Sequence, residues 1–407
     1  MRLLVGLHHL ELGGSQLNAL DFALAMREHG HDVAVFGVHT GVPGPVAEMV
    51  QSAGLPVTLV RHPVERHRAV VPYRRAVARG LTAAAKAHRA DLVHVYEFPL
   101  ALDAFDGPHL RLGLPVVVTI YGMAVPRWLP RYPELIVGTQ ELVDEATTFR
   151  APPTLIEPPV DTDTDDSAMV DGQAFRHALG IRDDELLLGV VSRLEPDMKA
   201  EGILRAMAAL RRLDDDRLRL VVVGTGPSAG DLHAEAARVN EALGRPAVLL
   251  PGALEDPRPA YAAMDIALGM GGSALRAMSF GRPLIVLGLA GFSRECTPQT
   301  LDNFLTVGFW GTGGGDLDDA PLAEQIRVLA ADPARRASLG GWSRRLVVER
   351  FSLKTAADKL AEVYARALVQ HPAAGRRLGE ATRAAVHKAA ADMLPESIRQ
   401  RLRRVRA

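Results

Sequence analysis

The stretch ELLLGVVSRLEPDMKAEG, residues 185–202, decides the fold. It opens with a nearly continuous apolar run, as in a strand that helices cover on both faces of its sheet. A short polar turn follows, and a helix is expected near residues 200–213. The next apolar run, LRLVVVG at 218–224, repeats the order of strand, turn and helix. This alternation predicts βαβ units and a parallel sheet.

The same alternation occurs on both sides of a break at residues 151–172. The break holds four prolines and a cluster of aspartates, which cannot sustain a helix or a central strand, so we interpret it as a linker. We therefore predict an α/β protein with two facing Rossmann-like domains, residues 1–165 and 166–348, and a ligand-binding cleft between them. The other runs assigned to strands are RLLVGL (2–7), HDVAVFG (31–37), LPVTLV (55–60), DLVHVY (91–96), LPVVVTI (114–120), LIVGT (135–139), AVLLPG (247–252), MDIALGM (264–270) and PLIVLG (283–288).

The composition excludes several classes of protein. A formal net charge of −1 provides no general attraction to nucleic acid. The single cysteine, Cys296, excludes a disulfide framework and a cysteine-based zinc site, and we expect it to be a small buried apolar residue. The opening MRLLVGLHH is too short for a secretory signal or a membrane span, and no other run approaches about 20 apolar residues. We expect a soluble cytoplasmic protein.

A glycine-containing turn, ELGGSQ at 11–16, connects the first predicted strand to a helix. Gly13 and Gly14 would let the backbone approach a ligand, and the amides at the helix start would stabilise an anion such as a diphosphate. We take these glycines and Gln16 as donor-binding candidates, and Ser15 as the N-cap. The alternative is a tight turn without a ligand.

Two further turns have the same form in the second half. Gly224 and Gly226 end a predicted strand just before a helix. In GMGGSALR, Gly272 precedes Ser273, which we expect to cap the next helix, and Arg276 lies one turn further on. Each turn is a candidate phosphate site, and Arg276 could face the same ligand or solvent.

Arg193 and Lys199 are the candidates for catalysis. Arg193 follows a predicted strand directly, and Lys199 comes six residues later near a helix start. Two cations at the carboxyl end of a sheet could hold both phosphates of a sugar nucleotide and stabilise the charge of the departing diphosphate. The alternative is two solvated surface cations.

The order of these motifs resembles that of the family 4 glycosyltransferases of the GT-B fold, over roughly residues 1–368. The final stretch ERFSLKTAADKLAEVY is similar to the family's closing helix, which implies that residues 349–369 cross back to the N-terminal domain and leave 370–407 as a basic helical tail. The resemblance implies retaining transfer from a nucleotide-diphosphate sugar without an essential metal or other cofactor, with Arg193 and Lys199 on the diphosphate. The motifs in question are GGSQ, VVVTIYG, IEPPVD, SRLEPDMK, VVVGTGP and RAMSFGRP.

The chain departs from the family pattern in its acidic residues. The family usually carries two glutamates eight residues apart, one near the donor sugar and one on the ribose. Here the segment between Asp265 and Arg276 is short, so the first glutamate has no counterpart, and Arg276 replaces the second. Arginine can only donate hydrogen bonds, so it could contact phosphate or bind a donor held differently.

The acceptor side also departs from the pattern. Tyr121 stands beside Gly122 where the family has histidine, and Tyr96 also replaces a frequent histidine. We expect Tyr96, Glu97 and Tyr121 to line the acceptor side of the cleft, with surface solvation as the alternative for Glu97. His8 and His9 end the first strand and could also edge the cleft, although no spacing suggests a metal site.

Two basic regions could contact partners. The segment 61–80 lies in the predicted acceptor domain, and the tail ends in ESIRQRLRRVRA, where Ile398, Leu402 and Val405 share one helical face. The tail pattern fits weak peripheral contact with a membrane, and a solvated or frayed helix is the alternative that we favour.

We therefore expect an enzyme that transfers a sugar from a nucleotide-diphosphate sugar to an acceptor hydroxyl, on a specialised metabolite or a lipid-linked molecule. Since both family glutamates are missing, the alternative is a non-catalytic GT-B subunit that binds a nucleotide or supports a partner enzyme. A sugar-nucleotide epimerase, which shares the fold, fits the ordered motifs least.

Overall fold

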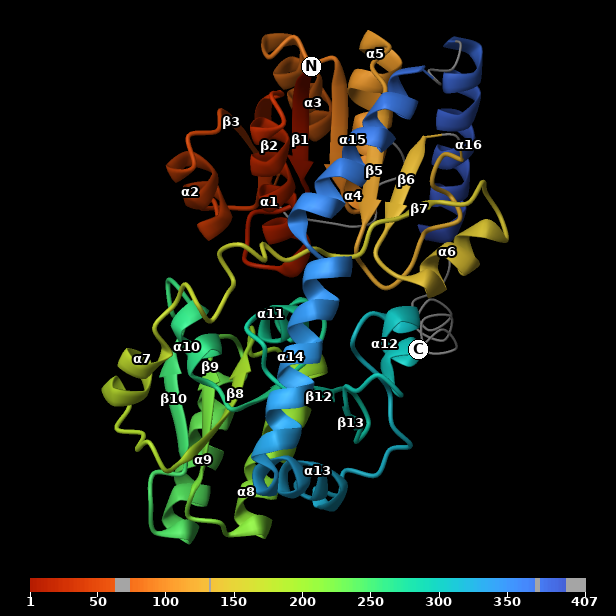
Figure 1. Ribbon diagram of the computed structural model, residues 1–407. Helices are drawn as coiled ribbons and strands as arrows, with labels where there is room; N and C mark the ends of the chain where they lie inside the picture. The colour runs from red at the N-terminus through yellow and green to blue at the C-terminus, as the bar shows by residue number, and fades with distance from the viewer. Residues whose placement is uncertain (63–73, 132, 370–373, 393–407) are drawn as a thin grey trace. The chain divides into compact units, whose positions relative to one another are not determined.

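The computed structural model describes residues 1–62, 74–131, 133–369 and 374–392. The chain divides into two compact units (Figure 1). The first contains Met1–Pro158 and the chain from Ala356 onward, and the second contains Pro159–Thr355. Each unit is described by itself below.

The first unit is built on a sheet of seven parallel strands in the order β3-β2-β1-β4-β5-β6-β7. The proline-rich stretch assigned to a linker contributes the short strand β7, which pairs only with β6 at the sheet edge. The strands are β1 (Arg2–Leu7), β2 (Asp32–His39), β3 (Val57–Arg61), β4 (Leu92–Tyr96), β5 (Val116–Ile120), β6 (Glu134–Val137) and β7 (Thr154–Leu155).

Helices cover both faces of this sheet, and the central strands are therefore almost entirely apolar. The helix α15 starts at Leu353 and belongs to the first unit from Ala356. The helices are α1 (Gly14–Glu28), α2 (Pro45–Ser52), α3 (Arg75–Ala87), α4 (Phe98–Ala104), the π-helical turn η1 (Phe105–His109), α5 (Leu110–Leu112), α6 (Gln140–Thr147), α15 (Leu353–Val369) and α16 (Ala374–Asp392).

A buried polar pair fixes α15 on the sheet. His94 of β4 bonds through Nδ1 to the Tyr364 hydroxyl at 2.8 Å and through Nε2 to Thr119 Oγ1 at 2.8 Å. Complete burial lowers the pKa of His94 to about 3, so the imidazole stays neutral in the folded protein. Both ring nitrogens are therefore satisfied without a charge in the core.

The second unit has a six-stranded sheet in the order β10-β9-β8-β11-β12-β13. Its strands are parallel except for β13, which pairs antiparallel to β12. They are β8 (Leu186–Val191), β9 (Leu218–Val223), β10 (Val248–Gly252), β11 (Ile266–Gly269), β12 (Leu284–Leu287) and β13 (Ser293–Glu295).

Two layers of apolar side chains lie on the faces of this second sheet, under helices on each side. The helices are α7 (Gly172–Ala178), the π-helical turn η2 (Pro196–Ala200), α8 (Glu201–Leu213), α9 (Ala229–Leu243), α10 (Arg258–Ala263), α11 (Gly272–Ser279), α12 (Leu301–Val307), α13 (Ala320–Ala331) and α14 (Pro333–Arg350).

The strand order reverses once in each sheet, between β1 and β4 in the first unit and between β8 and β11 in the second. Connections on the two sides of such a switch point diverge, and this leaves a crevice beyond the carboxyl ends of the two strands. Predicted site residues that directly follow these four strands are therefore the best placed to reach a ligand.

No helix in the described ranges combines the length and the apolar character that a bilayer span requires.

Candidate functional site

Arg193 follows β8 at the switch point of the second unit. Its side chain is 53% exposed, and its Nε donates to Glu195 Oε1 at 2.7 Å. The loop that carries it is held by backbone hydrogen bonds to the β9–α9 turn: Leu194 N donates to Thr225 O at 2.9 Å, and Ser228 N donates to Leu194 O at 3.1 Å. The structure thus presents the guanidinium from a loop that is pinned to its neighbour.

Gly224 and Gly226 permit this close packing of two loops. Their φ angles are +147° and +156°, a region that residues with a side chain rarely adopt. A Cβ at Gly224 would overlap the carbonyl oxygen of Ser192, and one at Gly226 would lie 2.6 Å from the carbonyl oxygen of Leu194. These glycines support the Arg193 loop, which is a structural reason for their presence besides the predicted contact with donor.

Lys199 lies in η2, where α8 begins with a single π-helical turn, a feature that often occurs at functional sites. Burial lowers the pKa of its ammonium to about 8. Within the described residues, the ammonium has no hydrogen bond or ion pair. A half-buried cation without a partner carries a desolvation cost, and binding of an anion would offset that cost.

The β11–α11 turn differs from the prediction in its cap. The N-cap of α11 is Gly271, with φ +59°, rather than Ser273. Ser273 lies inside the first helical turn, and its hydroxyl donates to Met270 O at 3.0 Å, because the left-handed residue at 271 starts the helix two positions earlier. No atom within 4 Å would meet a Cβ at Gly272, so open space lies before this helix start.

Arg276 is paired with an acidic residue that the prediction treated as part of the linker. Its Nε donates to Asp165 Oδ2 at 2.6 Å, and the Asp165 side chain is only 3% exposed. Burial raises the pKa of Asp165, and the Arg276 guanidinium opposes that rise. A contact of Arg276 with donor would therefore form beside an existing buried ion pair.

In the first unit, Gly13 rather than Ser15 is the N-cap of α1. Extended backbone at Gly13 starts the helix there, and this frees the Ser15 hydroxyl to donate to Glu97 Oε1 at 2.9 Å. A Cβ at Gly14 would meet no atom within 4 Å, so this helix start is also open.

Gln16 is buried rather than presented to a ligand. Its Nε2 lies 3.1 Å from His9 Nε2 and 3.4 Å from His8 Nδ1. Burial, with the nearby His9 and Arg74, lowers the pKa of His8 to about 3, so this imidazole is neutral. The side chain of Gln16 therefore shapes the β1–α1 loop, and its predicted contact with donor is not supported.

Glu97 follows β4 and joins three loops at the first switch point. Its Oε1 accepts hydrogen bonds from the Ser15 hydroxyl and, at 3.0 Å, from Tyr121 N of the β5 loop. Its φ of +67° is rare for a residue with a side chain, and such strain is concentrated at functional sites. Burial raises the pKa of Glu97, so solvation on the surface, the alternative, is wrong.

The two tyrosines predicted to line the acceptor side have buried hydroxyl groups. Tyr96 is 1% exposed within the sheet, so the prediction that it lines a cleft is wrong. The reason is that β4 is a central strand, covered on both faces. Tyr121 is partly exposed. Neither hydroxyl has a hydrogen-bond partner among the described residues.

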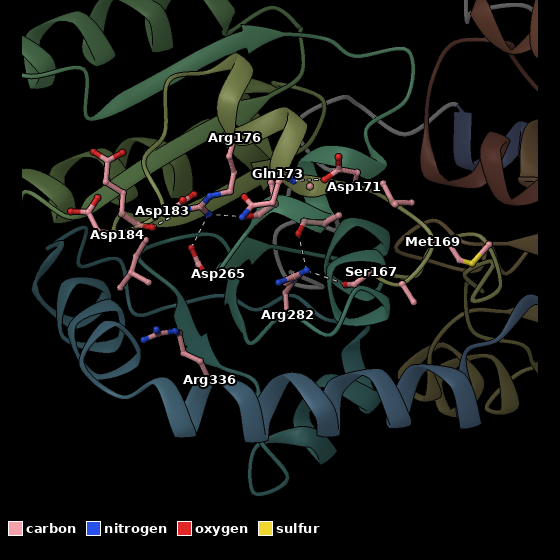
Figure 2. A pocket seen from close by; sticks show the side chains of 17 residues that line it. Ser167, Met169, Asp171, Gln173, Arg176, Asp183, Asp184, Asp265, Arg282 and Arg336 are labelled. Carbon is pink, nitrogen blue, oxygen red and sulfur yellow. Dashed lines mark hydrogen bonds and ion pairs between the residues drawn. The ribbon is translucent and has the colours of Figure 1, made fainter.

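A polar pocket lies at the opposite, amino edge of the second sheet (Figure 2). Its arginines are already bonded: Arg176 donates to Asp265 Oδ2 at 3.0 Å and to Glu185 O at 2.6 Å. Arg282 donates to Ser167 Oγ at 3.0 Å. These groups hold the loops around the hollow together, and ligands of open α/β sheets bind at the other edge.

Cys296 is completely buried, as predicted, and burial raises the pKa of its thiol to about 12. Among the described residues, no group of three or more His, Cys, Asp or Glu side chains is arranged to hold a metal ion.

The basic regions are described only in part. Within 61–80, residues 63–73 lie outside the described ranges, and Arg74 is paired with Asp103 through Nε and Oδ2 at 3.1 Å. In the tail, residues 393–407, including the apolar face at Ile398, lie outside them, while α16 packs against η1 and α5.

Besides the corrections above, sequence reasoning missed the hydrogen-bond and ion-pair partners of several of these residues. Ser15, Asp165 and Asp103 each bond a predicted or basic residue from a distant part of the chain. The only signal was the acidic character of the segment around Asp165, which is equally typical of a linker.

Comparison with known proteins identifies the class. A model described as Glycosyl transferases group 1 matches residues 185–331, and one described as Glycosyl transferase 4-like domain matches residues 13–155. The D-inositol 3-phosphate glycosyltransferase of Stackebrandtia nassauensis is 30% identical over 223 residues, which are 51% of this chain and 47% of that protein. This chain thus spans about half the length of that relative.

A second relative and a solved structure match more of their length. The D-inositol 3-phosphate glycosyltransferase of Mycobacterium marinum is 25% identical over 417 residues, 90% of this chain and 84% of that protein. The crystal structure of Anabaena Alr3699/HepE in complex with UDP matches with a TM-score of 0.69 and 18% identity, over 90% of this chain and 100% of that chain.

The chain is a glycosyltransferase of the GT-B fold. It belongs to the family 4 glycosyltransferases, as the matches to the group 1 and 4-like domain models show. The predicted family, fold class and enzyme class are confirmed.

Substitution of Gly224 tests the packing of the two loops. We expect Gly224→Ala to lower the free energy of unfolding of the second unit by roughly 1–3 kcal/mol, because the new Cβ overlaps the Ser192 carbonyl at a strained φ. Denaturant unfolding measures the loss, and hydrogen exchange should show faster exchange at residues 192–194.

Gly230→Ala is the matched control, since Gly230 lies in α9 with open space around it. It should be neutral or slightly stabilising, because alanine favours a helix. Equal exchange at residues 192–194 in both variants would contradict the packing argument.

Proposed function

We propose that this glycosyltransferase transfers a sugar, with retention, from a nucleotide-diphosphate sugar bound by the second unit to a hydroxyl of an acceptor bound by the first. The observation that carries the proposal is the Lys199 ammonium, half-buried and without a partner in the described chain, close in sequence to the pinned Arg193 loop. Both residues follow β8 at a switch point of the sheet.

The chemistry follows from the charge that develops during transfer. As the bond between sugar and diphosphate breaks, negative charge accumulates on the leaving phosphate, and two cations held in place lower the energy of that state. Lys199 supplies three N–H donors and Arg193 a planar guanidinium that suits phosphate oxygens. The amides at the open start of α11 provide a further seat for an anion.

The acceptor hydroxyl would attack the face from which the diphosphate leaves, so the departing phosphate takes its proton. No strong protein base is then required, which suits a site where Tyr121 replaces the family's histidine and its hydroxyl is buried. Glu97, held by Ser15 and Tyr121 N, would organise the acceptor loops. We also propose that no metal ion or other cofactor is needed, because the two cations supply the positive charge.

The relatives suggest the first substrates to test. Anabaena Alr3699/HepE was solved with UDP and with UDP-glucose, so UDP-glucose is the first donor probe. The curated relatives are named D-inositol 3-phosphate glycosyltransferases, so D-inositol 3-phosphate is the first acceptor probe, followed by lipid-linked and specialised-metabolite hydroxyl compounds. A cytoplasmic location is proposed as well, and any membrane contact would be peripheral.

One observation favours a second candidate, a non-catalytic subunit that binds a nucleotide. Arg276 occupies the position of the family's ribose-binding glutamate and is already paired with Asp165. Binding of UDP-glucose with neither transfer nor slow hydrolysis would favour this candidate over the enzyme.

The central test removes each cation separately. We expect Arg193→Ala and Lys199→Ala each to lower kcat about 10²- to 10³-fold, because each removes charge stabilisation of the leaving diphosphate. The melting temperature should change little for Arg193→Ala, since this side chain is mostly exposed. Steady-state kinetics with the best donor and acceptor pair measures the effect.

Arg211→Ala serves as the matched control, because Arg211 is an exposed arginine of α8 in the same unit. It should retain wild-type kcat. Wild-type turnover in Arg193→Ala and Lys199→Ala would remove both residues from the mechanism.

The pH dependence of donor binding tests Lys199 specifically. Its pKa of about 8 means that the ammonium is charged at pH 7 and loses its proton as the pH rises through 8. We expect the affinity for UDP to fall by up to about tenfold per pH unit above 8, as measured by calorimetric titration. Lys199→Arg, which stays protonated, should flatten this dependence, and an unchanged slope in that variant would rule out Lys199 as its cause.

Removal of divalent metal tests the proposed metal independence. Dialysis against EDTA should leave kcat within about twofold of the untreated enzyme, because Arg193 and Lys199 perform the role that a metal performs elsewhere. Loss of activity in EDTA that Mg²⁺ or Mn²⁺ restores would contradict the proposal.

A further inference from the structure

The tail helix α16 contacts the loop that follows β5. Arg383 Nη2 donates to the carbonyl oxygen of Leu129 at 3.0 Å, and Glu380 Oε2 accepts from the backbone N–H of Arg131 at 3.0 Å. The two side chains also pair with each other at 3.1 Å. One helix therefore satisfies both a donor and an acceptor of the loop backbone.

These contacts are sheltered. Arg383 and Glu380 are 20% and 23% exposed, and Ala381 and Ala384 between and beyond them are buried against the first unit. Hydrogen bonds from charged side chains to backbone are stronger than neutral ones, and partial burial limits their competition with water. The basic helix α16 thus packs against the rest of the first unit.

The same loop is held at other points. Arg150 donates to Pro130 O at 3.3 Å from a different segment, and Leu129 is buried beneath. The beginning of the loop is held where Glu97 accepts from Tyr121 N. Between these anchors Met123 is 59% exposed.

The β5 loop has no helix or strand of its own between residues 121 and 131. Its shape therefore depends on side chains of other segments that hydrogen-bond to its backbone. A segment without regular secondary structure needs such partners for its buried N–H and C=O groups. It starts at the carboxyl end of β5, next to β4 and the strained Glu97, where the acceptor is proposed to bind.

We propose that Glu380 and Arg383 of α16 are positioning residues that hold the β5 loop in the shape that the acceptor requires. The inference rests on the proposed function only in placing the acceptor at the first unit. It assigns a role to the tail that is separate from membrane contact, because Arg377, Glu380 and Arg383 of α16 bond to the first unit: Arg377 donates to His109 O at 3.2 Å.

The test compares Arg383→Ala and Glu380→Ala with the full-length enzyme. Each variant should raise the acceptor KM about tenfold, because each removes a charged hydrogen bond to the loop, while the Kd for UDP stays unchanged. Hydrogen exchange followed by mass spectrometry should show faster exchange in residues 121–131. Glu380→Gln keeps an acceptor oxygen for Arg131 N and should restore most of the protection.

Two controls separate positioning from general damage. Thr382→Ala removes a hydroxyl that donates to the Leu378 carbonyl of its own helix, and Arg345→Ala removes an exposed charge from the second unit. Both should leave exchange in residues 121–131 and the acceptor KM at wild-type values.

The possible outcomes distinguish a failure of this inference from a failure of the proposed function. Wild-type exchange in residues 121–131 of both alanine variants overturns the inference, whatever the activity. Faster exchange with an unchanged acceptor KM also overturns it, because the loop would then be held for another purpose. If the wild-type enzyme binds UDP but transfers sugar to no acceptor, the proposed function is wrong. The hydrogen-exchange result then still shows whether α16 holds the β5 loop.

Discussion

The reversal of strand order in each parallel sheet is the constraint on which the rest of this structure depends. Within each sheet, parallel strands bring the strand-to-helix turns to one edge, and the reversal at β1/β4 in the first sheet and at β8/β11 in the second separates the turns at one point of that edge. Helix starts, which favour anions, lie at both points, with open space at Gly14 and Gly272. Polar and charged residues can occupy these turns without altering the packing of either hydrophobic core.

The cationic side chains of the second unit differ in whether they are paired with a carboxylate. Three arginines of the second unit are paired with carboxylates: Arg219 with Glu185 at 3.1 Å, Arg176 with Asp265, and Arg276 with Asp165. Such pairs largely cancel their own fields and hold loops together. Lys199 differs, because burial lowers its pKa and no partner in the described chain offsets that cost. This contrast is the structural basis for proposing Lys199, rather than one of the paired arginines, as an anion-binding group.

Much of the fold and part of the site could be predicted. The apolar runs correctly indicated two parallel-sheet units, because strands buried on both faces must be apolar throughout. The helix caps at Ser15 and Ser273 were wrong, since glycines just before them take the extended or left-handed backbone that begins each helix. Tyr96 and Gln16 were also misjudged, because exposure depends on which elements cover a residue, and a linear pattern does not contain that information.

By itself, the sequence determined the family, the alternation of strands and helices, and the two cations after β8, because these depend on local order and residue type. Only the tertiary structure decided which charges are already paired, that Gly224 supports the Arg193 loop, and that α16 bonds the loop after β5. Those facts join residues far apart in the chain. Contacts of that kind are set by packing and by the satisfaction of buried polar groups, which emerge only when the whole unit is folded.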